Sequence, residues 1–80
     1  MSAEIRERLL AVIGEFAEDG TASDALRRGA RIPDVLALDS MGYVRLVVRL
    51  ESEFGVSIGF EEIDEAFADL DSLVRYFSAR

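Results

Sequence analysis

Apolar residues at the start of the chain repeat with the period of an α-helix. They fall on one helical face, at Ile5, Leu9, Val12, Ile13 and Phe16. This pattern predicts a helix from Ala3 to about Asp19, with Ser2 as its N-cap and Gly20 closing its C-terminal end. We interpret this helix as a core element, because nothing in its sequence suggests chemistry.

A second, strongly amphipathic pattern follows Asp39-Ser40. Because aspartate and serine are both good N-caps, it predicts a helix over about residues 41–54 that ends at Gly55. Met41 and Val48 lie on one shoulder of this helix, where spacing alone fits an exposed apolar strip and the edge of the core equally well. We expect core-facing residues at Tyr43, Val44, Leu46, Val47, Leu50 and Phe54, and solvent-facing residues at Gly42, Arg45, Arg49, Ser52 and Glu53.

The segment between these helices, residues 21–38, has the least regular pattern. Turn-forming residues interrupt it, and Pro33 disfavours helix at the residue before it, so the segment is predicted to be a long loop. A short turn at residues 23–28 is compatible with the sequence. The loop delivers Asp39-Ser40 to the surface, and we expect its apolar residues to pack across the core: Leu26, Ile32, Val35, Leu36 and Leu38.

Two shorter patterns complete the chain. Residues 60–67 predict a short helix, and Asp69 or Asp71 can cap a last helix that runs through Phe77. Apolar residues at helical spacing close the core from this end, at Ile63, Phe67, Leu70, Val74 and Phe77. The predicted fold class is therefore all-α, a small four-helix bundle with a short third helix and a long loop between the first two helices, in one domain of residues 1–80.

Composition narrows the functions that such a bundle can have. The chain contains no Cys, His or Lys, which excludes a cysteine nucleophile, a histidine base, a Schiff-base lysine and a Cys/His zinc site. Its net charge of −7 opposes binding to nucleic acid and to anionic membranes, and favours protein partners with basic or mixed surfaces. No apolar run is long enough to span a membrane and the N-terminus lacks a signal-peptide pattern, so we expect a cytoplasmic location.

Asp39-Ser40-Met41 and the helix after it form the most informative motif of the chain. In register they are followed by Val44, Leu46-Val47, Leu50-Glu51, Glu53-Phe54-Gly55-Val56 and Ile58. This arrangement resembles the acyl and peptidyl carrier protein family. The resemblance implies that Ser40 carries a 4′-phosphopantetheine arm derived from coenzyme A, and that Asp39 belongs to the motif that a phosphopantetheinyl transferase recognises. A phosphodiester at a helix N-terminus is favoured by free N–H groups and by the helix dipole.

A second Asp-Ser pair, in Asp71-Ser72-Leu73, matches the family's Asp-Ser-Leu motif literally, whereas Met41 follows Ser40. Only eight residues follow Ser72, however, which is too few for the helix that should come after the modified serine and for two more. A motif counts only when its structural context agrees. We therefore predict that Ser40 is the attachment site and that Asp71-Ser72 is a helix cap.

The resemblance further implies that partner enzymes dock on the strip of Met41 and Val48. Arg45 and Arg49 lie one turn apart beside this strip, and Arg49 can also pair with Glu53. Family members that serve fatty acid synthesis usually have an acidic residue at position 45, so the two arginines argue against that pathway and are expected to select the partner. We expect a monomeric, non-catalytic, discrete carrier that holds acyl or aminoacyl groups as thioesters in a polyketide, non-ribosomal peptide or related pathway.

The expected partners are a phosphopantetheinyl transferase and acyl- or aminoacyl-loading, condensing, tailoring or thioesterase enzymes. Other classes fit less well. An enzyme would need a nucleophile with a base, and the chain has no Cys, His or Lys. A calcium-binding loop would need more alternating acidic residues than Asp69 and Asp71 supply. DNA binding is opposed by the net charge, despite the basic cluster of Arg27, Arg28 and Arg31. The alternative that remains open is a helical protein-interaction module that is never modified.

Overall fold

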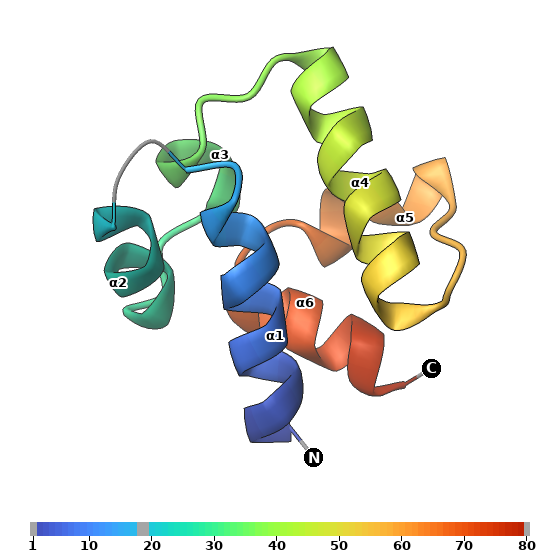
Figure 1. Cartoon of the computed structure of the whole chain (residues 1–80), viewed down its shortest axis with the longest axis horizontal. Helices are drawn as coiled ribbons and strands as arrows, with labels where there is room; N and C mark the ends of the chain where they lie inside the picture. The colour runs from blue at the N-terminus through green and yellow to red at the C-terminus, as the bar shows by residue number, and fades with distance from the viewer. Residues whose placement is uncertain (1, 18–19, 80) are drawn as a thin grey trace.

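Helices make up most of the computed structural model, which describes residues 2–17 and 20–79 (Figure 1). They are α1 (Ser2–Gly14), α2 (Thr21–Arg27), α3 (Ile32–Val35), α4 (Ser40–Phe54), α5 (Phe60–Ala66) and α6 (Leu70–Ser78). α1 packs against α6, α4 and α2, while α5 packs against α6 and α2 against α3. Figure 1 shows α1 in the middle of the molecule, with α2 and α3 on one side and α4 and α5 on the other. The prediction of a small all-α bundle is confirmed.

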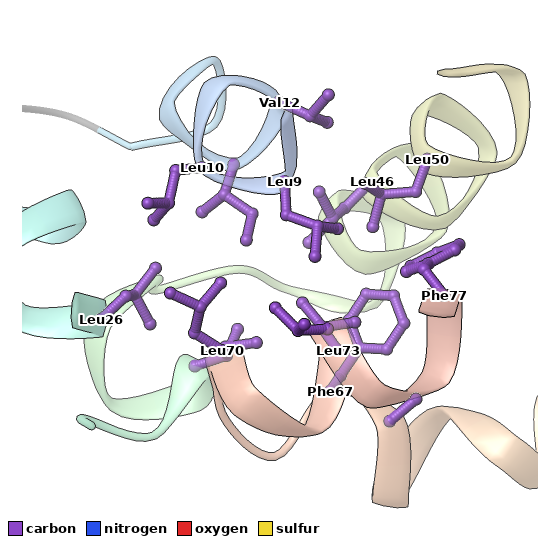
Figure 2. Packing of buried hydrophobic residues seen from close by; sticks show 14 of the residues in the cluster. Leu9, Leu10, Val12, Leu26, Leu46, Leu50, Phe67, Leu70, Leu73 and Phe77 are labelled. Atoms are coloured by element: carbon purple, nitrogen blue, oxygen red, sulfur yellow. The ribbon is translucent and has the colours of Figure 1, made fainter. Parts of the chain in front are cut away.

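The core forms where α1, α4 and α6 meet, and Figure 2 shows leucines from all three helices pointing into it. Its buried residues are Leu9, Leu10, Val12, Ile13, Leu26, Ile32, Leu36, Leu46, Leu50, Ile58, Ala66, Phe67, Leu70, Leu73, Val74 and Phe77. The predicted apolar faces of α1 and α6 are thereby confirmed. Leu10, which the sequence pattern did not place in the core, is buried too, because α1 has neighbouring helices on more than one side.

α1 ends earlier than its apolar pattern predicts. Its last helical residue is Gly14, after which successive N–H groups bond the carbonyl three residues back and the helix tightens into a turn. The prediction of a helix to about Asp19 that is closed by Gly20 was therefore wrong, since glycine at position 14 already weakens the helix there. Gly20 instead precedes the first residue of α2. The Ser2 side chain, predicted as the N-cap, and residues 18–19 lie outside the described part.

The connection between α1 and α4 is more regular than a loop. It contains α2, where only a short turn over residues 23–28 was expected, and the single helical turn of α3. Pro33 lies in the first turn of α3, where a missing N–H removes no intrahelical bond. The apolar residues of this segment pack on the core as predicted, with Leu26, Ile32 and Leu36 buried.

Capping residues mark the C-terminal end of α4 and the N-terminal end of α6. Gly55 ends α4 in the left-handed conformation, with φ of 67°, as predicted. Asp69 caps α6, because its carboxylate accepts a bond from the Ser72 N–H at 2.8 Å. The prediction that Asp71-Ser72 forms a cap was wrong, since both residues lie inside α6 and the Asp71 carboxylate pairs with Arg6 at 2.8 Å.

Ion pairs on the surface join α1 to the C-terminal half of α4. Arg49 donates to Glu15 of the α1 turn and to Glu53, at 3.0 Å in both ion pairs, which confirms the predicted pairing with Glu53. Arg8 also reaches Glu53, where it donates to the carboxylate at 3.1 Å and to the backbone carbonyl at 2.7 Å. Its guanidinium lies 4.5 Å from the centre of the Phe54 ring. A cation at the carbonyl end of a helix is favoured by the helix dipole.

Candidate functional site

The N-terminal turn of α4 presents Ser40, the first residue of the helix, with an exposed side chain. Asp39 precedes it in an extended conformation and caps the helix, since its carboxylate accepts a bond from the Gly42 N–H at 2.7 Å. The Asp39 carbonyl accepts the Tyr43 N–H at 3.0 Å. Within the described ranges, the N–H groups of Ser40 and Met41 donate to no oxygen. The Ser40 hydroxyl therefore lies at the positive end of a fifteen-residue helix, beside two free donors.

Glycine at position 42 has a steric role in this turn. A Cβ atom there would lie 3.1 Å from the Cβ and Cδ2 atoms of Leu38 and 3.3 Å from Oδ1 of Asp39. Both distances are shorter than ordinary van der Waals contact. The missing side chain lets Leu38 lie over the first turn while Asp39 keeps its capping bond. This packing explains why glycine occupies position 42, although glycine costs about 1 kcal/mol relative to alanine in a helix interior.

A groove opens beside Ser40, between α4 and the segment that leads into α5. Its volume is about 730 Å³, and it is lined by Leu38, Asp39, Ser40, Tyr43, Val44, Val47, Val48, Glu51, Ile58 and Ile63. One side of α4 packs against α1, and another side faces Ile58 and Ile63 across the groove. The lining is mostly apolar, so the groove suits a hydrocarbon chain attached near Ser40.

The polar side chains of the groove differ in whether they have hydrogen-bond partners. The Asp39 carboxylate is bonded to the Gly42 N–H, and Oε2 of Glu51 accepts a bond from the Ile58 N–H at 2.8 Å. The second bond holds the α4–α5 connection against α4. The Tyr43 hydroxyl is buried and has no hydrogen-bond partner in the part of the chain that the structure describes. Burial raises the pKa of the Tyr43 phenol, which keeps it neutral.

The shoulder of α4 carries an apolar strip, which we define as Met41, Val44 and Val48. These side chains are 61%, 43% and 56% exposed, respectively. Of the two interpretations that the sequence left open for Met41 and Val48, the structure therefore supports the exposed strip. The placement of Val44 in the core was wrong, because the fully buried part of α4 is limited to Leu46 and Leu50.

The two arginines predicted to select a partner have different surroundings. Arg49 is half-buried, and hydrogen bonds to the carboxylates of Glu15 and Glu53 raise the pKa of its guanidinium. Arg45 is exposed and forms no hydrogen bond or ion pair with any residue that the structure describes. Arg45 therefore presents its charge to solvent beside the apolar strip, whereas most of the bonding capacity of Arg49 is already used within the protein.

Ser72, the serine of the second Asp-Ser pair, lies in a different environment. It is the third residue of α6, and its N–H donates to the Asp69 carboxylate at 2.8 Å. Its hydroxyl accepts a bond from Arg75 at 3.3 Å, and its side chain is partly buried. Ser72 therefore differs from Ser40, which starts its helix and has an exposed side chain.

Comparison with known families accounts for this geometry. The family model described as the phosphopantetheine attachment site matches residues 3–77, nearly the whole chain. The chain therefore belongs to the phosphopantetheine-binding family, which confirms the resemblance seen in its sequence. It is a phosphopantetheine-carrying carrier protein, and carrier domains of this family interact with a phosphopantetheinyl transferase and with the enzymes of a pathway. No solved structure matches the chain significantly.

The surroundings of Ser40 fit a phosphopantetheine group. The exposed hydroxyl can accept the group, and the free N–H groups of Ser40 and Met41 favour the anionic phosphodiester. The Asp39 carboxylate is bonded to the Gly42 N–H, which offsets part of its repulsion of that anion. The groove provides apolar surface next to Ser40. The group itself supplies a terminal thiol, on which an acyl group is held as a thioester.

No helix within residues 2–17 and 20–79 is long and apolar enough to cross a membrane. The same residues contain no cluster of three or more His, Cys, Asp or Glu side chains that could hold a metal ion.

Proposed function

We propose that Ser40 is the residue that carries the phosphopantetheine arm. The observation that supports this best is its exposed hydroxyl at the first position of α4, next to free N–H groups and the groove. In the transfer, Ser40 Oγ attacks the pantetheine-bearing phosphorus of coenzyme A and the adenosine bisphosphate part leaves. The proton of the hydroxyl passes to a base, which we propose the transferase supplies. Asp39 caps the helix and is the residue before Ser40 that the transferase would meet.

The test is a transferase assay with coenzyme A, read by intact mass. Ser40→Ala should keep the mass of the unmodified protein, while the wild type gains one phosphopantetheine group. Ser72→Ala is the matched control, because it removes the other serine that follows an aspartate and should be modified normally. Modification of Ser40→Ala would contradict the assignment. No modification of the wild type by several transferases would favour the alternative of an unmodified protein-interaction module.

We further propose that residues 1–80 act as one non-catalytic carrier domain of a polyketide, non-ribosomal peptide or related pathway. The arm would hold an acyl or aminoacyl intermediate, and loading, condensing, tailoring or thioesterase enzymes would act on it. Support comes from Arg45, which is positively charged at a position where carriers of fatty acid synthesis usually have an acidic residue. Release and mass analysis of the acyl group from the isolated modified protein would identify the pathway class.

The apolar strip and Arg45 are proposed to form the docking surface for these enzymes. Met41, Val44 and Val48 are exposed next to Ser40, and burial of their apolar area against a partner would be favourable. The unpaired Arg45 would then face acidic or hydrogen-bonding groups at the edge of the contact, where charges act mainly on association rate and specificity. Arg49 is expected to contribute less to docking, because Glu15 and Glu53 already hold its guanidinium.

A further inference from the structure

Tyr43 lines the groove, and its hydroxyl is closed to solvent and has no hydrogen-bond partner among the described residues. The Asp39 and Glu51 carboxylates in the same lining already bond backbone N–H groups, and Ser40 is the proposed attachment point. Tyr43 is different, because its hydroxyl is buried without a partner among the described residues. Such groups are rare in native proteins, because burial removes their hydrogen bonds to water without replacing them.

The position of Tyr43 gives its ring room to move. Tyr43 lines the groove and also lines a second cavity of about 390 Å³, together with Arg31, Pro33, Ile63, Asp64, Phe67 and Ala68. Tyr43 also lies three residues after Ser40, and residues at this spacing are neighbours on a helix surface. These two cavities adjoin the Tyr43 side chain, and a rotation about its Cα–Cβ bond would bring the hydroxyl toward a group that lies in the groove.

The rest of the groove determines what kind of group would complete it. Its other lining residues are apolar: Leu38, Val44, Val47, Val48, Ile58 and Ile63. A saturated chain would cover these residues but would leave the hydroxyl unpaired. A chain of the same length with a carbonyl or hydroxyl oxygen would cover them and would also pair the hydroxyl. A neutral phenol can both donate and accept a hydrogen bond, so either kind of oxygen is suitable.

We propose that the Tyr43 hydroxyl hydrogen-bonds an oxygen of the tethered acyl group, so that this carrier retains oxygenated chains in its groove in preference to saturated chains. The inference rests on the proposed attachment of the arm at Ser40. It makes oxoacyl and hydroxyacyl thioesters the preferred cargo class. Tyr43 is then a specificity-determining residue of the carrier.

The experiment compares three cargoes on the same protein. A transferase loads the chain with hexanoyl-, 3-oxohexanoyl- or 5-oxohexanoyl-phosphopantetheine from the corresponding coenzyme A thioesters, and intact mass confirms each product. The rate at which 2-mercaptoethanol exchanges with each thioester, read as the return of the unacylated phosphopantetheine mass, is then measured on the folded protein and, as the reference, on the unfolded protein. The ratio of the two rates reports how far the groove protects the cargo, and it corrects for the different reactivities of the thioesters.

At least one oxo chain should be protected more strongly than hexanoyl. In Tyr43→Phe, which removes only the hydroxyl, the protection of that oxo chain should fall about two- to tenfold, the range expected for one hydrogen bond, while hexanoyl protection stays unchanged. Tyr76→Phe is the matched control, because it removes a hydroxyl that bonds Glu62 outside the groove, and it should keep the preference.

Equal protection of the three chains in the wild type would overturn the inference. So would a loss of protection in Tyr43→Phe that is the same for all three chains, since the hydroxyl would then not act on the cargo oxygen. A protein that no transferase can load at Ser40 would contradict the proposed attachment instead, so the two failures are distinguishable. Tyr43→Phe removes a group without a partner, and its melting temperature, expected to equal or exceed that of the wild type, verifies that the variant folds.

Discussion

The Asp39 side chain has one observed role, as a helix cap, and one proposed role, in transferase recognition, and substitution can separate them. Its carboxylate accepts the Gly42 N–H at 2.7 Å and so caps α4, the helix that begins with Ser40. Its negative charge is also part of the motif that a transferase would read. Asp39→Ala removes the cap and the charge together, whereas Asp39→Asn removes the charge and keeps an oxygen that can accept the same bond.

The magnitude follows from the capping bond. Asp39 is exposed, so alanine leaves no cavity and the loss is limited to the cap. Replacing a capping aspartate by alanine costs about 0.5–2 kcal/mol, typically about 1 kcal/mol. For a domain of this size, about 1 kcal/mol lowers the melting temperature by about 4–8 °C. Asp39→Asn should melt close to the wild type, because aspartate and asparagine are similarly good caps.

Thermal unfolding followed by circular dichroism gives the first measurement, and the rate of modification by a transferase gives the second. We expect Asp39→Ala to be less stable and more slowly modified, and Asp39→Asn to be stable but slowly modified. Equal melting temperatures of the wild type and Asp39→Ala would refute the capping argument. Normal modification of Asp39→Asn would show that the transferase does not use the charge, and the role of Asp39 would then be structural.

Three further outcomes are expected. Hydrogen bonds from Arg49 and Arg8 lower the pKa of Glu53 below its ordinary value of 4.5. The ionised carboxylate therefore stabilises the fold above that pH, and this stabilisation is lost as the pH falls through the lowered pKa. Glu53→Gln should therefore make the decline of stability in acid shallower, and an unchanged acid profile measured by chemical denaturation would contradict this. Arg45→Glu should slow transfer to the cognate enzyme, most at low salt, and Arg28→Glu, at the C-cap of α2, is the charge-matched control that should not. Met41→Ala and Val48→Ala should slow that transfer with little change in stability. The control Leu46→Ala, in the core, should lower the free energy of unfolding by about 2–5 kcal/mol. A large stability loss in both strip variants would rule out an exposed docking strip.

Much of the fold and the position of the site could be predicted from the sequence. Capping residues and a terminal glycine determine where a helix begins and ends through local bonds, which is why the bounds of α4 follow from Asp39 and Gly55. The assignment of the chain to its family depends on the same local motif with the helix after it. The choice of Ser40 over Ser72 remains a prediction, based on how much chain follows each serine.

Other features were decided only when the helices packed together. Periodicity gives the direction in which Val44 points around α4, but it does not give the 43% exposure of this side chain, which depends on how the other elements pack around α4. Likewise, Arg49 pairs with Glu15, which is 34 residues away in the sequence, and no local pattern could have indicated that contact. The groove arises from the space between α4, the α4–α5 connection and α5, and the burial of the Tyr43 hydroxyl likewise depends on how these elements pack. Local sequence determines hydrogen bonds within a helix, whereas burial, cavities and long-range ion pairs depend on which surfaces meet, and only the tertiary structure decides that.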